Sequence, residues 1–276
     1  MAPLGLGTGF YGVGPAMGSD NAAGVVTPIG TAVRVVRGTD EGVIATQGAN
    51  LKSTFQGSFT IAFWIEVVSG QTDYAPFIFG SLGDGTDLIT LQNATDGKLT
   101  FTFAGDSDTH QNKTDAAVFA SGANAYKHIA VTMTKVGGGN STSIIYVDGD
   151  AVNTSIVGSN EIAEAKHAAF DDEGDVFAIG AIGTVLDSNT TGLGIPADFA
   201  EFAIWNAALD AAAVAVVHDA GKPTAANNPN LLVDEDDYDV SSNLVAYWKL
   251  NDYSGGRAKE SKSGFDARLN GVSVFI

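Results

Sequence analysis

Aspartate residues in several glycine-rich turns could bind a metal ion. Calcium takes about six to eight oxygen ligands from carboxylates, amides and backbone carbonyls, so Asp/Asn/Gly loops suit it better than regular strands. If consecutive strands run antiparallel, the turns after residues 81, 105 and 149 share one end of the molecule, and those after 67, 93 and 135 share the other. The first end would gather Asp84, Asp87, Asp106, Asp108, Asp148 and Asp150, of which the first four are the candidate calcium site. The alternative is that these residues are only turn formers.

Other residue types limit the enzyme classes. A retaining glycosidase needs two carboxyl groups about 5 Å apart, and no predicted strand carries acidic residues alternating along one face. The four histidines form no His-Glu-x-x-His motif and no pair at i, i+4, so a zinc hydrolase is disfavoured. With no cysteine, disulfides and thiolate chemistry are absent. A Ser-His-Asp triad assembled from distant positions stays open, although nothing in the sequence favours it.

Aromatic residues divide into core and surface candidates. Tyr74 and His110 lie in predicted loops and are the candidate carbohydrate-binding residues, although a single aromatic residue in a loop is more often ordinary surface. Trp64, Trp205 and Trp248 are expected to pack between two sheets. Phenylalanines that alternate along predicted strands are expected in the core, namely Phe59, Phe63, Phe101, Phe103 and Phe177.

The elements that would position these residues are mostly strands. Runs of β-branched and aromatic residues alternate with turn signals such as Thr95-Asp-Gly97 and Asp148-Gly149, which is typical of an antiparallel sandwich. One short helix is predicted near residues 209–220, with Asp210 as its cap and Gly221 and Pro223 at its end. The predicted strands are 31–36, 42–46, 59–66, 76–79, 88–91, 99–103, 126–134, 143–147 and 175–179.

Several of these stretches resemble the concanavalin A-like lectin/glucanase superfamily, in its laminin-G and pentraxin-like jelly-roll branch. The matching strands are 58–65, 126–133 and 143–149. The strand-then-helix sequence of the family matches at Phe199, Glu201, Phe202, Ile204, Trp205, Asn206, Ala208 and Leu209. Ala200 stands where the family usually has Asp, so the role of that carboxylate does not carry over. The resemblance implies an all-β, two-sheet antiparallel β-sandwich (jelly roll) that acts by binding.

Composition restricts the partners. The formal net charge of -18 would repel nucleic acid, and no apolar run is long enough to span a membrane. Residues 31–276 are expected to form the sandwich, and residues 1–30 a Gly-rich N-terminal arm. The start of the chain has no basic region followed by a continuous apolar one, so a secretory signal is not expected. The apolar Leu4, Leu6, Phe10 and Tyr11 suggest that the arm either lies on its own domain or grips another subunit, giving a homo-oligomer, with a trimer favoured.

The order of the family sequences suggests where the protein acts. Residues 244–255 resemble a sequence that many extracellular members carry at the front of the domain, whereas here it follows the helix. That order, with the Gly-rich N-terminus, resembles laminin-G-like structural proteins of tailed phages. It implies a non-enzymatic virion structural protein (head decoration, tail or fibre-associated) on the virion exterior, contacting other virion proteins and a host-surface glycan. The alternatives are a secreted or surface carbohydrate-binding module and, least favoured, a glycosidase.

Overall fold

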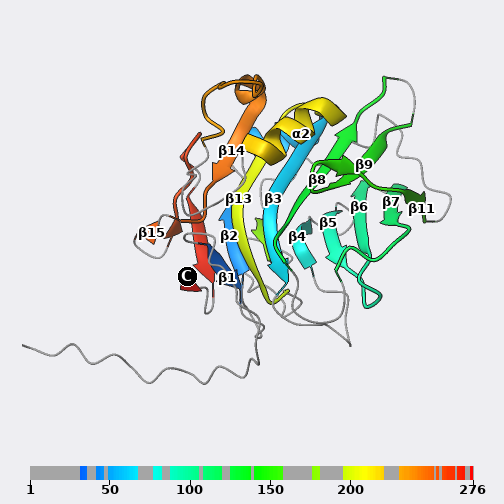
Figure 1. The fold of residues 1–276 in the computed structure, drawn as a ribbon, viewed down its shortest axis with the longest axis horizontal. Helices are drawn as coiled ribbons and strands as arrows, with labels where there is room; N and C mark the ends of the chain where they lie inside the picture. The colour runs from blue at the N-terminus through cyan, green and yellow to red at the C-terminus, as the bar shows by residue number, and fades with distance from the viewer. Residues whose placement is uncertain are drawn as a thin grey trace, which may run out of the picture.

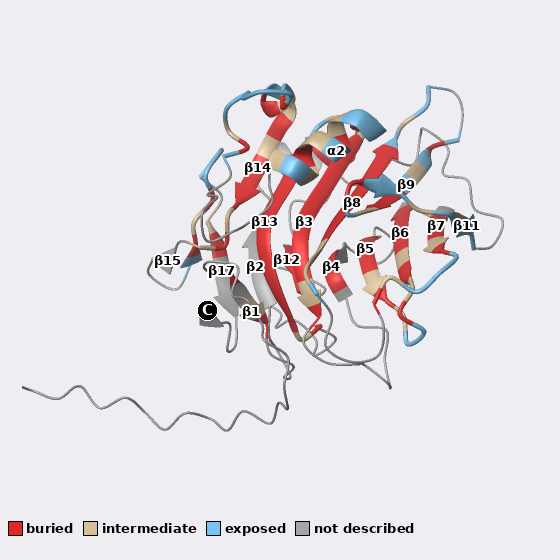
Figure 2. Cartoon of the chain, viewed as in Figure 1, coloured by how far each residue is buried: buried red, intermediate tan, exposed pale blue. Residues whose placement is uncertain are grey.

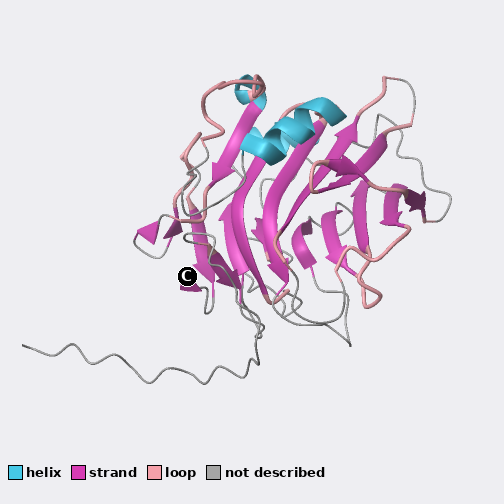
Figure 3. Cartoon of the chain, in the orientation of Figure 1, coloured by secondary structure: helices cyan, strands magenta, loops and turns pink. Residues whose placement is uncertain are grey.

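The computed structural model shows a molecule built almost entirely of antiparallel strands (Figures 1 and 3). It describes residues 32–35, 42–46, 49–67, 77–82, 88–105, 108–119, 125–137, 140–157, 176–180, 195–220, 230–251, 253–254, 257–264, 266–270 and 274–275. The expected all-β sandwich of two antiparallel sheets is confirmed.

The first sheet contains eight strands in the described part of the chain. Their order is β10 (Asp150–Ala151), β9 (Thr142–Val147), β8 (Lys127–Thr134), β3 (Phe59–Val67), β13 (Ala197–Trp205), β1 (Val33–Val35) and β18 (Val274–Phe275). The eighth strand, β14 (Leu244–Trp248), also pairs with β13. Because β1 pairs with residues 197–199 of β13 and β14 with residues 202–205, the two strands lie end to end along the same strand.

The second sheet contains ten described strands. Their order is β11 (Thr154–Ile156), β7 (Asp108–Thr114), β6 (Leu99–Gly105), β5 (Leu88–Asn93), β4 (Phe77–Leu82), β12 (Val176–Ile179), β2 (Gly42–Thr46), β17 (Ala267–Asn270), β16 (Arg257–Ala258) and β15 (Tyr253–Ser254). The chain passes from this sheet to the first after β7, and returns to it between β10 and β11.

The long central strands β3 and β13 are buried along most of their length (Figure 2), and the core between the sheets is rich in phenylalanine. All five phenylalanines expected there are fully buried. Phe63 stacks on Phe202 with ring centroids 5.1 Å apart, and Phe59 packs edge-on against Phe55 at 5.2 Å. Alternation along β3 therefore directs its odd-numbered residues into the sandwich, as a strand period of two requires.

The tryptophans correct one expectation. Trp248 lies in the core between the sheets, whereas Trp205 and Trp64 belong to clusters on the outer face of the first sheet. The cause in β13 is an irregularity in its pairing between Ala200 and Ala203, where Glu201 has a φ of 54°. After this β-bulge Phe202 faces the core and Trp205 faces outward, because a bulge changes which side of the sheet the next residues face.

Two α-helices are described, one more than expected. The predicted helix is α2 (Ala211–Ala220), and Asp210 caps it by accepting a hydrogen bond from the Ala213 amide at 2.9 Å. It covers the outer face of the first sheet (Figure 1), and its Val214 and Val217 pack in one hydrophobic cluster with Trp205. The prediction missed α1 (Ala49–Phe55), a short helix held by its buried Leu51 and Phe55. A single 3-10 turn, Ser241–Asn243, precedes β14.

Candidate functional site: a groove at one end of the sandwich

The structure corrects the placement of His110. This residue was expected in a loop, but it lies in β7, is only 2% exposed, and its Nε2 is 2.8 Å from the Ser143 hydroxyl. A sugar cannot stack on an imidazole that other side chains cover, so the structure gives His110 a packing role. The other candidate platform, Tyr74, lies outside the described residues.

The expected calcium ligands are mostly outside the described residues as well. Asp84, Asp87 and Asp106 are among them, and Asp108 is the first residue of β7, opposite Gly105. Leu82 pairs with Leu88, and Leu88 with Ala104, so the last residues of β4 and β6 and the first of β5 lie together at one end of the second sheet. Within the described ranges, no three His, Asp or Glu side chains gather as a metal site would require.

Asp148 and Asp150 lie at the opposite end of the molecule from Asp108. The Asp115 amide donates to the Asn153 carbonyl at 2.9 Å, which places the turn around Asp148 and Asp150 beside the end of β7. The expectation that they join Asp84 and Asp108 is wrong because β7 was not predicted. One extra strand reverses the direction of every strand that follows it.

At this opposite end, the structure contains a groove of about 430 Å³. It is open where the chain crosses between the two sheets. We call it the end groove. Its volume lies at the low end of the range of about 300–1,000 Å³ typical of small-ligand sites. It is lined by Thr114, Asp115, Ala116, Ala117, Val118, Lys127, Val147, Ala151, Val152 and Asn153.

The end groove has an apolar floor and a polar border. Val118, Val147 and Val152 are half-buried and pack against the main core, so each presents its remaining surface to the groove. Asp115 and Asn153 are exposed and lie side by side, joined through their backbones. One carboxylate oxygen of Asp115 accepts a 2.6 Å hydrogen bond from Ser155.

The loop that forms one wall, residues 115–119, is held by the neighbouring β5–β6 turn. The Gly97 carbonyl accepts hydrogen bonds from the amides of Val118 at 2.7 Å and Phe119 at 3.0 Å. Gly97 has a φ of 75°, and a Cβ there would lie 1.9 Å from the Phe119 carbonyl oxygen. Only glycine fits this position, since it both tolerates positive φ and lets the loop approach.

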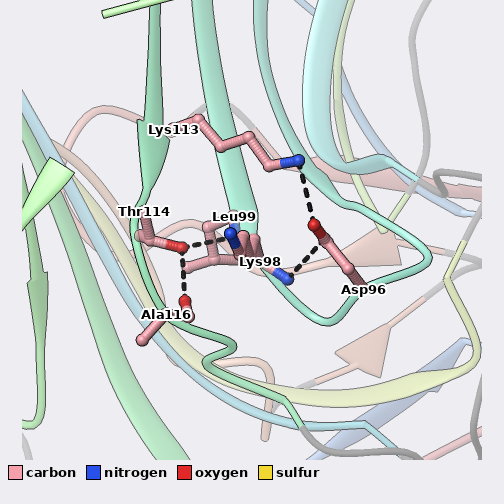
Figure 4. A network of polar contacts seen from close by, with 6 residues as sticks. All are labelled: Asp96, Lys98, Leu99, Lys113, Thr114 and Ala116. Carbon is pink, nitrogen blue, oxygen red and sulfur yellow. Dashed lines mark hydrogen bonds and ion pairs between the residues drawn. The ribbon is translucent and has the colours of Figure 1, made fainter. Parts of the chain in front are cut away.

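A polar network on the same turn supports the wall (Figure 4). The Thr114 hydroxyl accepts from the Leu99 amide at 3.0 Å and donates to the Ala116 carbonyl at 2.9 Å. Asp96 accepts from the Lys98 amide at 3.2 Å and pairs with Lys113 at 3.1 Å. The turn and the strand end are therefore cross-linked, which fixes the loop before any ligand binds.

Lys127 is the cationic residue of the lining. Its ammonium group is 3.3 Å from the Asp148 carboxylate, and the two side chains are 29% and 44% exposed. Asp148 has a φ of 52° and also accepts a 2.9 Å hydrogen bond from the His128 amide. The turn that holds Asp148 is thus fixed by β8, so Lys127 has a fixed acidic neighbour.

Behind this turn, three rings pack on the outer face of the first sheet. The His218 ring stacks on Trp64 at 5.2 Å, and His128 contacts both rings, with centroids 5.3 Å from Trp64 and 5.5 Å from His218. Burial, with a smaller effect of His218, lowers the pKa of His128 to about 3. His128 is therefore neutral over the physiological range.

The structure also pairs two carboxylates that the sequence did not suggest. Glu66 and Asp198 are directly opposite on β3 and β13, and Arg34 binds Asp198 through two 2.7 Å hydrogen bonds. Burial and the nearby Asp198 raise the pKa of Glu66. Asp198 is fully buried, so this pair is closed to a substrate on that side.

A further buried carboxyl group lies at the junction of β1 and β14. Glu201 is 5% exposed and accepts a hydrogen bond from the Tyr247 hydroxyl. Burial raises the pKa of Glu201 to about 7, although Tyr247 and Lys249 oppose the shift. The pKa of Tyr247 is also raised, by burial and by the Glu201 charge.

Comparisons with known proteins identify the fold. The candidate carbohydrate-binding protein from Bacteroides ovatus ATCC 8483 is similar with a TM-score of 0.55 and 16% identity, over 90% of this chain and 60% of that chain. A botulinum neurotoxin type C structure, from work on cell entry that depends on two ganglioside molecules, gives a TM-score of 0.50 and 17% identity. That match covers 72% of this chain and 44% of the toxin chain. This chain thus spans less than two thirds of either neighbour.

No curated protein sequence matches the chain significantly. Among the helices in the described part of the chain, none has the length and apolar character needed to cross a membrane. The sequence model of one family matches residues 37–215, which is well over half of the chain. The chain therefore belongs to the concanavalin A-like lectin/glucanases superfamily, in its laminin-G branch.

Proposed function

We propose that this protein is a non-enzymatic binding domain that holds a carbohydrate in the end groove. The observation that carries the proposal is the groove itself, an apolar valine floor bordered by Asp115, Asn153 and Lys127. A sugar ring has an apolar face of C–H groups and an edge of hydroxyl groups. Such a ligand places its C–H face on the valines and its hydroxyls against the border.

The polar border supplies both kinds of hydrogen-bonding group. Asp115 has one carboxylate oxygen bonded to Ser155, and the other can accept from a hydroxyl. Asn153 can donate and accept through its side-chain amide, and Lys127 donates. Each hydroxyl of a sugar can both donate and accept a hydrogen bond, so neighbouring hydroxyls can bond to Asp115, Asn153 and Lys127 together.

Binding without catalysis is supported by the arrangement of the carboxyl groups. The one carboxylate in the lining is Asp115, whereas glycoside hydrolysis needs a second carboxyl group across the scissile bond. Glu66 and Asp198 do lie opposite each other, but the Arg34 guanidinium occupies Asp198.

A glycan array followed by titration calorimetry tests this proposal. We expect the protein to bind at least one glycan. Asn153→Ala removes a side-chain amide that can donate to and accept from the sugar hydroxyls, so we expect it to lower the affinity by about tenfold or more. The matched control is Asn243→Ala, remote from the groove at the start of β14. Equal affinity of the Asn153→Ala protein would place the ligand elsewhere on the domain, and an absence of any glycan ligand would contradict the proposal.

The second candidate is a virion structural protein that displays this domain on the particle exterior. One observation in support is that residues 244–255, which resemble a sequence found at the front of the domain in many extracellular members, come after the helix in this chain. A second is the acidic net charge of -18, which suits a solvated exterior. Its partners would be other virion proteins and further copies of the chain. Mass spectrometry of purified particles tests it. A chain found only in the culture medium, free of particles, would instead favour a secreted module.

A further inference from the structure

We infer that the end groove selects neutral glycans and discriminates against acidic ones carrying carboxylate or sulfate groups. The inference rests on the proposed function and specifies the ligand class of the same site. It follows from the charged side chains around the groove. Carboxylates outnumber ammonium groups there, and Lys127 of the lining already forms an ion pair with Asp148.

The charges can be assigned residue by residue. Asp115 lines the groove, Asp148 follows the lining residue Val147, and Asp150 precedes the lining residue Ala151. All three are exposed. Neighbouring residues are about 3.8 Å apart along the chain, and charges in 0.1 M salt act over about 10 Å. All three carboxylates therefore act on a ligand in the groove.

The opposing positive charge is limited. Lys127 has Asp148 at 3.3 Å, the nearby Lys113 is paired with Asp96 at 3.1 Å, and Lys98 lies close to the same Asp96. An anionic sugar would have to compete with Asp148 for Lys127 while approaching Asp115. A neutral sugar meets no such repulsion, and its hydroxyls can donate to the lining carboxylate of Asp115.

Paired glycans on one array provide the test, each neutral glycan printed beside its sialylated, sulfated or uronate counterpart. We expect the neutral member of each bound pair to bind more tightly, by about threefold or more. Raising the salt from about 20 mM to about 500 mM should narrow this gap, because salt screens repulsion of the acidic member only. Tighter binding of the acidic members would overturn the inference and leave the proposed function standing. Binding to no glycan would contradict the proposed function itself.

A charge-neutralising variant makes the test specific to this groove. Asp148→Asn keeps an acceptor for the His128 amide and suits the φ of 52°, since asparagine tolerates this region. It frees Lys127, so we expect affinity for acidic glycans to rise severalfold while neutral binding changes little. The control Asp237→Asn removes the same charge from an exposed loop away from the groove. An equal gain in the control would show that the net charge of the chain, and not the groove, sets the preference.

Discussion

At the scale of single residues, two positions have a positive φ that is important for the structure around them. Gly97 adopts a φ of 75° beneath the wall of the end groove, and Glu201 adopts a φ of 54° in the bulge of β13. In both cases tertiary contacts impose the conformation: the Phe119 carbonyl approaches Gly97, and the Lys249 carbonyl accepts the Glu201 amide at 3.2 Å. Substitutions at these positions therefore report on the groove and on the sheet junction.

Gly97→Ala should destabilise the protein and disorder the groove. Non-glycine residues at such φ values cost about 1–3 kcal/mol, and the added Cβ would also collide with the Phe119 carbonyl. Gly264→Ala is the matched control, because Gly264 has a φ of 80° with no atom within 4 Å of its Cβ position. Denaturant unfolding should show a larger loss for Gly97→Ala. Equal losses for the two variants would mean that the loop yields to the methyl group easily.

Glu201 should make stability depend on pH near neutrality. Its folded pKa of about 7 lies above the ordinary value of 4.5, so between these values the folded protein holds a proton that the unfolded chain has lost. The stabilisation is full below about pH 4.5 and is lost as the pH rises through about 7, by about 3 kcal/mol in all.

Glu201→Gln tests this dependence, because glutamine stays neutral at every pH. The free energy of unfolding of the variant relative to the wild type should increase from pH 5 to about pH 8. Tyr247→Phe removes a hydrogen bond that lowers the pKa of Glu201, so it should move the transition to higher pH. A constant difference between Glu201→Gln and wild type from pH 5 to 8 would contradict the assignment.

At the scale of elements, long strands rich in apolar residues, such as β3, β6 and β8, were predicted from the sequence, whereas the polar strand β7 was missed. β7 reads Asp-Thr-His-Gln-Asn-Lys-Thr, so it lacks the alternation by which β6 was recognised. Its inward residues His110, Asn112 and Thr114 are polar, and each makes a hydrogen bond: His110 and Asn112 with Ser143, and Thr114 with the Ala116 carbonyl. The end groove could not be predicted, since its position depends on the strand directions that β7 sets.

The acidic turns before β5 and β7 still make a testable element. In the sequence, Asp84 and Asp87 come after β4, and Asp106 and Asp108 come after β6, and these two strands finish at the same end of the second sheet. If they hold calcium, a chelator should lower the melting temperature and added calcium should restore it, because a ligand bound only to the folded state stabilises it. Asp84→Asn with Asp87→Asn should abolish the response. A melting temperature that ignores both treatments would leave these residues as turn formers.

At the scale of the whole molecule, the two edges of the first sheet are available for different roles. β1, which follows the N-terminal arm, lies near one edge of the first sheet, and the end groove lies beside β10 at the opposite edge. If residues 1–30 grip a partner beside β1, that partner would lie at the edge away from the groove. Glycan binding and assembly could then proceed together on one domain.

Deleting residues 2–25 separates these two roles. The described sandwich begins at Ala32, so we expect the truncated chain to stay folded, with an unchanged melting temperature and unchanged glycan affinity. Oligomerisation, as a trimer or through another virion protein, should be lost if Leu4, Leu6, Phe10 and Tyr11 supply the apolar contacts, as their types in the sequence led us to expect. Light scattering and particle co-sedimentation measure this. Replacing those four residues by serine in the full chain is the matched variant and should also abolish assembly. Assembly that survives both changes would contradict the role of the arm, and unfolding of the truncated monomer would show that the arm packs on its own sandwich.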